Sequence, residues 1–291
     1  MLGRNDKVPL VYILGTSFSG STLLGFVLGS SRQIFNLGEV KIIEKFRHQR
    51  DCSCGKGIRD CPFWTVFDFD ATAAAPRVSF WQKLSAFASV LIGNTDIRPR
   101  PDNVDRFLAE ALVSARALDP DHRYLLDVSK SLWRLIYLMR CSNIDLKVVY
   151  LERDAHGAVA SFVKRGDGFW RSLLIHAVNN FLIKRFLKRH RVDHIHVDYA
   201  RFCAQPERSL ETIGTYLSVD FGDYAAGVRQ RDFHILTGNA GTRTSVLRDF
   251  QGVAYDDSWK QRLTGFQKFV LDGVNGGRDV RPAPAEGVSR S

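Results

Sequence analysis

The chain has 291 residues and is 45% hydrophobic, so it is long enough to bury a sizeable core as one large domain. Its 41 Lys and Arg against 31 Asp and Glu give a formal charge of +10 at pH 7, which favours an anionic partner. The basic residues are dispersed apart from one run, "KRFLKRHR" at 184–191. A small polyanion therefore accounts for the charge as well as a polymer does, and we expect no nucleic-acid partner.

Cysteine usage and hydropathy indicate where such a chain resides. Five cysteines are an odd and modest number for a disulfide framework, and no secretory signal is evident at the start of the chain. The apolar stretch 169–187 contains Arg171, His176 and other polar residues, so it is not expected to span a membrane. We therefore expect a cytoplasmic protein.

Apolar runs and helical periodicity alternate along the chain. Short apolar runs predict four buried strands, at 8–14, 123–129, 146–153 and 193–199. A helix is predicted to open at Ser19 or Gly20, and further helices at 78–92, 104–118, 132–140, 155–164, 169–190 and 206–217. This alternation predicts an α/β fold, a parallel sheet with helices on both faces, as a single domain over residues 1–274. The segment 94–103 is predicted to be a surface loop or lid, and 275–291 a disordered tail.

A glycine-rich stretch, "GTSFSGSTLL" at 15–24, follows the first predicted strand. It nearly matches the nucleotide loop G-x-x-x-x-G-K-[ST], but Ser21 occupies the lysine position. A strand, a glycine turn and a helix present free backbone N–H groups that bind phosphate or a similar oxyanion. An ordinary strand–helix connection rich in small residues is the alternative. Without the lysine or an evident metal-binding acid, a small-molecule kinase is the weaker enzymatic hypothesis.

Two further predicted strands end in basic residues, Lys130 in "DVSK" and Arg153 in "ERD". Ligands of parallel sheets bind at the carboxyl ends of the strands, so these residues are expected near the glycine loop. Asp154 is placed to cap the helix after Arg153, and Ser161 lies two turns into that helix. An arginine and a hydroxyl in this geometry suit one anion, although a salt bridge of Arg153 with Glu152 or Asp154 is the alternative.

Taken together, five segments resemble motifs of the sulfotransferases that use 3′-phosphoadenosine 5′-phosphosulfate (PAPS). "FSGSTLL" is similar to their phosphosulfate loop, [RK]-S-G-[ST]-T-x-L, and "LERDAHGAVASF" to their 3′-phosphate motif. "LLDVSKSLWRL" resembles a D-x-[ST]-K-x-x-x-R block, and "HVDYARFCAQPERSL" and "HILTGNAGTR" resemble two later blocks. The segments occur in the family's order and span residues 8 to about 243.

The resemblance implies a sulfotransferase fold, with a parallel sheet like that of the P-loop NTPases, and sulfuryl transfer from PAPS without a metal. It implies that Lys130 stabilises charge on the leaving phosphate. It places Arg153 and Ser161 on the 3′-phosphate, with Arg243 as a possible helper. The phosphosulfate group would be bound by the loop residues Ser17, Phe18, Ser19, Gly20, Ser21 and Thr22.

A hydroxyl acceptor also needs a general base. Glu39 in "FNLGEV" is the first candidate, since tyrosyl-protein sulfotransferases have a glutamate in a similar Gly-Glu context. His156, His176 and His234 are rivals, and a carboxylate that merely starts a helix is the alternative for Glu39. The acceptor itself stays open among sugars, lipids or lipid-linked glycans, phenols and natural products.

One position departs from the family pattern, because Phe18 stands where the loop normally has a basic residue. A phenyl ring cannot donate hydrogen bonds to sulfuryl oxygens. Either another cation serves, or the protein binds PAPS with weak or no turnover. The ring could also help to form an apolar acceptor pocket.

Three cysteines lie close together in "HQRDCSCGKGIRDCPFW". Cys52, Cys54 and Cys61 with His48 would make a structural zinc site, although the second half of an ordinary four-ligand pair is missing. A local disulfide is a second hypothesis, and reduced packing cysteines are favoured over both.

Overall fold

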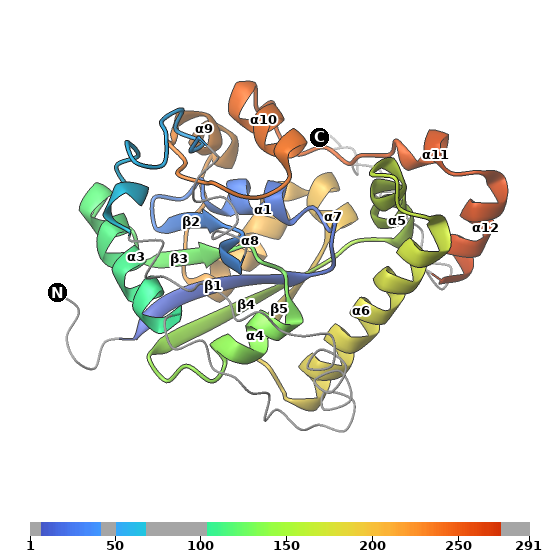
Figure 1. Ribbon diagram of the computed structural model, residues 1–291, viewed down its shortest axis with the longest axis horizontal. Coiled ribbons are helices and arrows are strands. Elements are labelled where there is room, and N and C mark those ends of the chain that lie inside the picture. The colour runs from blue at the N-terminus through green and yellow to red at the C-terminus, as the bar shows by residue number, and fades with distance from the viewer. Residues whose placement is uncertain (1–6, 42–50, 68–103, 275–291) are drawn as a thin grey trace, which may run out of the picture.

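The fold is known from a computed structural model that describes residues 7–41, 51–67 and 104–274 (Figure 1). Its centre is a five-stranded sheet in the order β2-β3-β1-β4-β5, and each neighbouring pair is parallel. The strands are β1 (Val8–Gly15), β2 (Ile34–Gly38), β3 (Tyr124–Asp127), β4 (Ile144–Glu152) and β5 (His194–Asp198). The predicted α/β parallel sheet is therefore confirmed.

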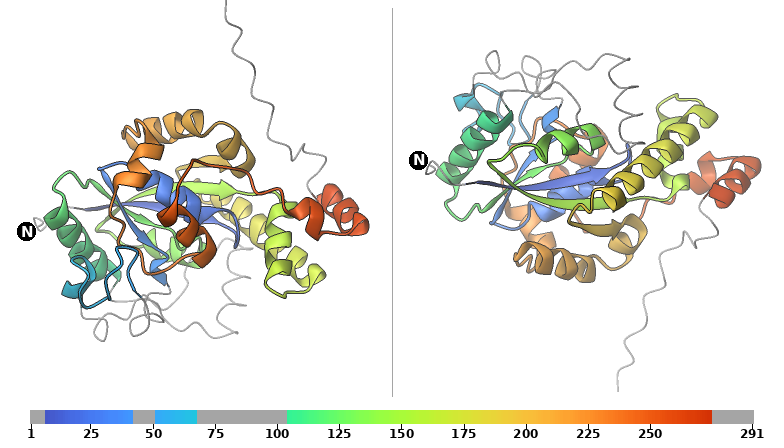
Figure 2. Two further views of the ribbon diagram at one scale, coloured as in Figure 1. Left: turned by 90° about the horizontal axis from the view of Figure 1, so that it is seen from above. Right: turned by 90° about the horizontal axis from the view of Figure 1, so that it is seen from below.

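Helices cover both faces of this sheet (Figure 2). One face packs against α3, α4, α6 and residues 51–67, and the other packs against α1 and α7 to α9. In chain order the helices are α1 (Ser21–Leu28), α3 (Val104–Leu118), α4 (Leu132–Leu138), α5 (Ala155–Lys164), α6 (Phe169–Arg189), α7 (Tyr199–Ala204) and α8 (Pro206–Leu217). They are followed by α9 (Tyr224–Gln230), α10 (Ala240–Arg248), α11 (Trp259–Arg262) and α12 (Gly265–Val274).

The central strand β1 shows why the first apolar run lacks alternation. Leu10, Tyr12 and Leu14 belong to the core on one face, and Val11 and Ile13 to the core on the other, all fully buried. A parallel strand covered on both faces needs apolar residues at every position.

The parallel pairing brings the carboxyl ends of the strands together. Gly15 at the end of β1 pairs with Leu151, and Gly38 at the end of β2 pairs with Asp127. The segments after β1, β2, β3 and β4 therefore emerge at one edge of the sheet, where the candidate residues were predicted to meet.

Several elements differ from the sequence prediction, among them α7, which begins at Tyr199, the last residue of the predicted strand 193–199. The strand β2 was not predicted, because "IFNLG" is only five residues long and follows α1 after a short turn. The short helices α9 to α12 were also not predicted, since they lie in a polar, glycine-rich part of the chain. The predicted helix 78–92, loop 94–103 and tail 275–291 lie outside the described residues, and a single domain over 1–274 stays a prediction.

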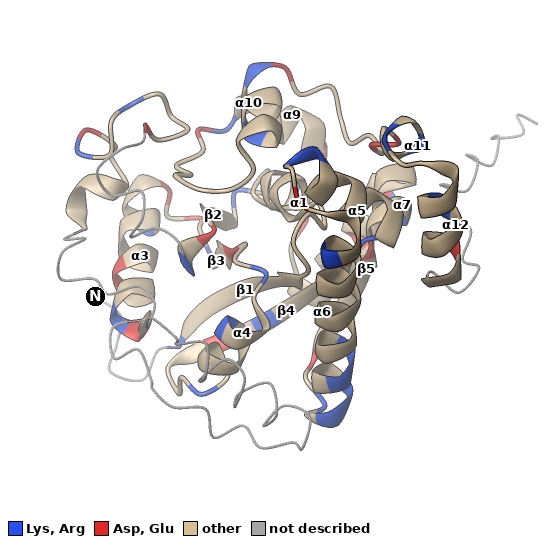
Figure 3. Ribbon diagram, turned by 45° about the vertical axis from the view of Figure 1, so that its right-hand side comes forward, with Lys and Arg blue, Asp and Glu red and all other residues tan. Residues whose placement is uncertain are grey.

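The dense basic run lies on the last turns of α6, at the end remote from α5 (Figure 3). Lys184 there donates to Glu152 Oε1 at 2.7 Å, so part of this charge is neutralised within the fold. None of the helices within 7–41, 51–67 and 104–274 combines the length and apolar composition needed to cross a bilayer.

Candidate active site

The glycine loop joins β1 to α1 through two residues in the left-handed region, Phe18 at φ 62° and Gly20 at φ 87°. A Cβ at Gly20 would lie 2.1 Å from the Tyr199 ring, so the loop approaches this tyrosine as only glycine allows. Gly20 also precedes α1 without a side-chain cap. The first N–H groups of α1 therefore lack a side-chain acceptor, which makes this helix start suited to an anion.

The loop also carries hydroxyl groups whose hydrogen bonding is incomplete. Among the described residues, the buried atoms Thr16 Oγ1 and Ser19 Oγ have no hydrogen-bond partner. Thr22 Oγ1 accepts from the backbone N–H of Asn239 at 3.2 Å, which ties the start of α1 to α10. The side chains of Thr16 and Ser19 are both buried, and neither residue lines the cleft.

Arg153 lies directly after β4, with its side chain against the loop. Its Nη1 donates to the Phe18 carbonyl at 3.1 Å, and the guanidinium lies 4.6 Å over the Tyr199 ring. Its Nε and Nη2 are buried and have no hydrogen-bond partner in the described part of the chain. A Cβ at Gly157 would lie 2.5 Å from Arg153 Nε, so this glycine makes room for the guanidinium. The guanidinium is thus fixed in place, and its Nε and Nη2 can still donate hydrogen bonds to a ligand.

The acidic neighbours of Arg153 are engaged elsewhere, so the salt-bridge alternative is not what the fold adopts. Asp154 caps α5 as predicted, accepting from the backbone N–H of Gly157 at 2.7 Å. Glu152 accepts hydrogen bonds from His196 and Lys184. Burial alone would raise the pKa of Glu152, but the hydrogen bonds from His196 and Lys184, together with the Lys184 charge, outweigh it and lower that pKa to about 2.

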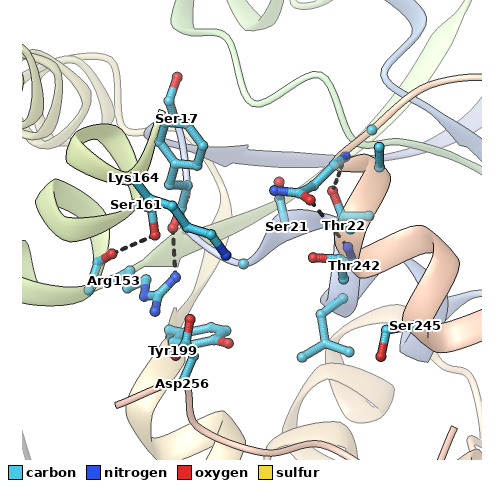
Figure 4. Close-up of a pocket in the computed structure, with 18 of the residues that line it drawn as sticks. Ser17, Ser21, Thr22, Arg153, Ser161, Lys164, Tyr199, Thr242, Ser245 and Asp256 are labelled. Atoms are coloured by element: carbon cyan, nitrogen blue, oxygen red, sulfur yellow. Dashed lines mark hydrogen bonds between the residues drawn. The ribbon is translucent and has the colours of Figure 1, made fainter. Parts of the chain in front are cut away.

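Ser161 lies on α5 and lines the same cleft as Arg153 (Figure 4). Its Oγ donates to the Gly157 carbonyl at 2.7 Å, which leaves the oxygen lone pairs for other partners. The predicted pair of an arginine and a hydroxyl is therefore brought to one side of the cleft.

The side chain of Phe18 turns toward α5. Its ring meets the Phe162 ring edge-on at 4.5 Å, and the guanidinium of Arg165 lies 5.1 Å above it. Arg165 and Lys164 both line the cleft, and neither was predicted from the sequence. The signal that would have found them is the pair of cations at the end of the predicted helix 155–164. The Arg165 cation thus lies next to Phe18, the loop residue that departs from the family's basic pattern.

Lys130 and Glu39 form an ion pair at another edge of the cleft. Lys130 Nζ lies 2.5 Å from Glu39 Oε1, with side chains only 13% and 12% exposed. The backbone N–H of Glu39 donates to Thr237 Oγ1 at 2.7 Å, and Lys130 takes a left-handed φ of 46°. Lys41, which was not predicted from the sequence, also lines the cleft. Burial, and then the charge of Lys130, lowers the pKa of Lys41.

A buried ion pair fixes the turn that carries Lys130. Arg134 Nε lies 2.5 Å from Asp127 Oδ2, and the other carboxylate oxygen accepts from the backbone N–H of Ser129 at 2.9 Å. Asp127, Ser129, Lys130 and Arg134 are the specified residues of the D-x-[ST]-K-x-x-x-R segment. The first and last of these hold the turn, and the lysine is left to face the cleft.

The cleft has a volume of about 1270 Å³. This exceeds the roughly 300–1,000 Å³ of ordinary small-molecule sites, so there is room for two substrates. In Figure 4, Arg153, Ser161, Lys164 and Tyr199 lie on one side, and Thr22, Thr242 and Ser245 on the other. The predicted residues that line it are Ser17, Phe18, Gly20, Ser21, Thr22, Glu39, Lys130, Arg153 and Ser161. Ser19 lies within the loop itself, fully buried.

The three rival histidines do not line the cleft. His156 Nε2 lies 3.2 Å from Asp272 Oδ1, and His234 faces a cysteine cluster. His176 contacts Asn180, and burial lowers the pKa of His176 to about 4. Arg243 also lies outside the cleft lining, where its Nη1 donates to the Leu236 carbonyl at 2.9 Å. Glu39 is therefore the only one of the four base candidates in the cleft.

The parallel sheet, the glycine loop before α1 and the arginine after β4 define a class, the α/β folds that bind phosphate-bearing ligands at the carboxyl ends of their strands. Within that class the chain has the sulfotransferase fold. It resembles the sulfotransferase domain of the Synechococcus PCC 7002 olefin synthase, with 18% identity, a TM-score of 0.56, and coverage of 96% of this chain and 98% of that one.

A second solved structure is similar to this chain. The sulfotransferase domain from the curacin biosynthetic pathway has 18% identity and a TM-score of 0.53, with 92% of this chain and 98% of that chain covered. No model of a protein family and no curated protein matches the chain by sequence. The predicted sulfotransferase fold is therefore confirmed by structure.

Proposed function

We propose that this protein is a PAPS-dependent sulfotransferase that transfers a sulfuryl group to the hydroxyl of a small-molecule, glycan or lipid acceptor. The observation that carries the proposal is Arg153. Its guanidinium is buried, held on the loop carbonyl of Phe18 and over Tyr199, and keeps two donor atoms without a partner among the described residues. Unsatisfied buried donors cost about 1–3 kcal/mol each, more for charged groups, and a ligand phosphate would offset that cost.

The residues present fit the nucleotide. Ser17 to Thr22 would hold the 5′-phosphosulfate through the uncapped start of α1 and the hydroxyls of Ser17, Ser21 and Thr22, which line the cleft. Arg153 and Ser161 would hold the 3′-phosphate. Arg243 would act indirectly, since its hydrogen bond to the Leu236 carbonyl helps to position the segment before Gly238, which lines the cleft.

Glu39 and Lys130 suit the chemical step. Bound PAPS supplies the sulfuryl group and a leaving bisphosphate. The Glu39 carboxylate would accept the proton of the attacking hydroxyl, and Lys130 would stabilise the charge that develops on the leaving oxygen. In the protein alone the two side chains form an ion pair at 2.5 Å, so each is held in place before substrates arrive.

The charge near Phe18 favours turnover over binding alone. Arg165 lies over the Phe18 ring and lines the cleft, so a cation is available where the family's loop normally has a basic residue.

A kinase needs a carboxylate for its metal, and the acids at the ends of β3 and β4 are already engaged. Asp127 is bound by Arg134, and Glu152 by Lys184.

The test is a transfer assay with ³⁵S-labelled PAPS and pooled acceptors of each class: sugars, phenols, lipids and hydroxylated natural products. We expect label in an organic product whose mass has increased by one sulfuryl group, and no product from Lys130→Ala. Arg208→Ala on the exposed side of α8 is the matched control and should stay active. Nucleotide binding without transfer to any class would favour a PAPS-binding protein, and phosphate transfer from Mg²⁺-ATP would favour the kinase.

A further inference from the structure

A compact group of sulfur and nitrogen atoms lies outside the cleft. The ligand atoms of Cys52, Cys54, Cys61 and His234 all lie within 4.8 Å of one another. Cys54 is half-buried and the other three are buried. The histidine comes from a segment some 170 residues later in the chain, so the fold itself assembles this group. His48, the fourth ligand that the sequence suggested, lies outside the described residues.

The spacing of the ligand atoms of Cys52, Cys61 and His234 matches a tetrahedral metal shell, and Cys54 Sγ lies within 4.8 Å of each of them. Bond lengths of about 2.3 Å to sulfur and 2.0–2.1 Å to nitrogen put neighbouring ligand atoms about 3.5–3.8 Å apart around zinc. Cys61 Sγ lies 3.5 Å from Cys52 Sγ and 3.3 Å from His234 Nδ1, and Cys52 Sγ lies 3.9 Å from the same nitrogen. A disulfide requires about 2.05 Å, and none is formed.

The backbone around the cysteines is folded to present them. The backbone N–H of Cys52 donates to the Lys56 carbonyl at 2.8 Å, and Gly55 takes a φ of 81° to close the turn. Asp51 and Gly57 form an antiparallel bridge, which completes a tight knuckle. Such a turn directs the thiols of Cys52 and Cys54 to one point, as metal knuckles do.

Hydrogen bonds outside the group fix the histidine. The backbone N–H of Ile235 donates to Ser53 Oγ at 2.7 Å, and Ser53 Oγ donates to the Phe233 carbonyl. Trp64 Nε1 donates to the His234 carbonyl at 2.8 Å. Ser53 and Trp64 lie near the cluster cysteines in the sequence, and their hydrogen bonds to the backbone of residues 233–235 therefore fix the position of His234. Such outer contacts orient the ligands of metal sites.

We propose that Cys52, Cys54, Cys61 and His234 bind a structural Zn²⁺ ion. Three sulfurs and one imidazole nitrogen complete a closed tetrahedral shell of the Cys₃His type, with no position left for a substrate. Binding converts the three thiols to thiolates with release of their protons, and His234 binds through Nδ1 with its proton on Nε2. The inference is independent of the proposed function.

The ion would anchor the segment that borders the active site. From His234 the chain runs to Thr237, which accepts from the backbone N–H of Glu39, and to Asn239, which donates to Thr22 Oγ1. Fixing His234 therefore also fixes the segment that follows it, which contacts both Glu39, the general-base candidate, and the start of α1. This gives the knuckle a role in stability rather than in the chemical step.

The first test is metal content. Untagged protein, dialysed against metal-free buffer without a chelator, is analysed for zinc, iron and copper, and its intact mass is measured under denaturing conditions. We expect about one zinc per chain and a mass with all cysteines reduced. Zinc below about a tenth of an equivalent would overturn the proposal, and so would iron in its place or a mass two hydrogens lighter, which marks a disulfide.

The second test uses matched variants. Cys54→Ser should lose zinc, Cys54→His should retain it, and Cys141→Ser, a half-buried thiol outside the cluster, should behave as the wild type. Stripping the wild type with 1,10-phenanthroline should lower Tm by at least about 5 °C, and added Zn²⁺ should restore it. Equal zinc content in Cys54→Ser and Cys141→Ser would contradict the assignment, even if both fold.

Discussion

Replacing Arg153 with Ala should reveal which phosphate this residue binds. The guanidinium reaches the cleft with Nε and Nη2 unpartnered, while Nη1 is already used on the Phe18 carbonyl. A charged hydrogen-bonding group contributes about 1.5–3 kcal/mol. At about 1.4 kcal/mol per factor of ten, the Kd for adenosine 3′,5′-bisphosphate should rise about 10- to 150-fold.

Calorimetric titration with two nucleotides makes this prediction specific. Adenosine 5′-phosphate lacks the 3′-phosphate, so its Kd should change by less than about threefold in Arg153→Ala. Arg208→Ala should leave both constants unchanged, and Gly157→Ala should mimic part of the effect, because its Cβ would lie 2.5 Å from Arg153 Nε. Equal weakening of both nucleotides would mean that Arg153 only supports the loop through Phe18, and the reasoning would be refuted.

Three further predictions test the reacting groups and the fold. Glu39→Gln should lower kcat about 10²- to 10⁴-fold in the transfer assay without changing nucleotide Kd, and unchanged turnover would remove Glu39 as base. Asp127→Ala should destabilise the fold by about 3–5 kcal/mol in urea unfolding, because it leaves Arg134 buried and unpaired, whereas the double variant Asp127→Leu/Arg134→Met should recover part of the loss. The folded-state pKa of His176 is about 4 against the usual 6.5, so stability is complete above pH 6.5 and falls on acidification toward pH 4. This loss amounts to about 2 kcal/mol at pH 5, and His176→Gln should flatten the decline between pH 7 and 5; an equally steep decline would contradict it.

The parts of the fold that the sequence predicted are those set by local pattern. The apolar run of β1 and the periodicity of α3, α5 and α8 place these elements almost to the residue. The position of Arg153 could be predicted because a residue at the carboxyl end of a parallel strand lies at the same edge of the sheet as the glycine loop. Asp154 was assigned as a cap by its position alone, and its hydrogen bond to Gly157 confirms it.

The parts that the sequence did not predict depend on contacts between distant residues. His234 joins Cys52 and Cys61 only because the segment after α9 returns beside the knuckle, so the nearer His48 was the natural choice from spacing. The approach of Arg165 to Phe18 likewise depends on how α5 packs against the loop. Spacing along the chain reports neither contact.

A comparison of two ligands, titrated in parallel into the wild-type protein, tests the central claim most directly. Adenosine 3′,5′-bisphosphate, the product of sulfuryl transfer from PAPS, is titrated in one cell and Mg²⁺-ATP in another at the same ionic strength. The account predicts one bisphosphate site per chain, with binding at least about tenfold tighter than that of ATP, a difference of about 1.4 kcal/mol. Saturable binding of Mg²⁺-ATP with none of the bisphosphate would contradict it.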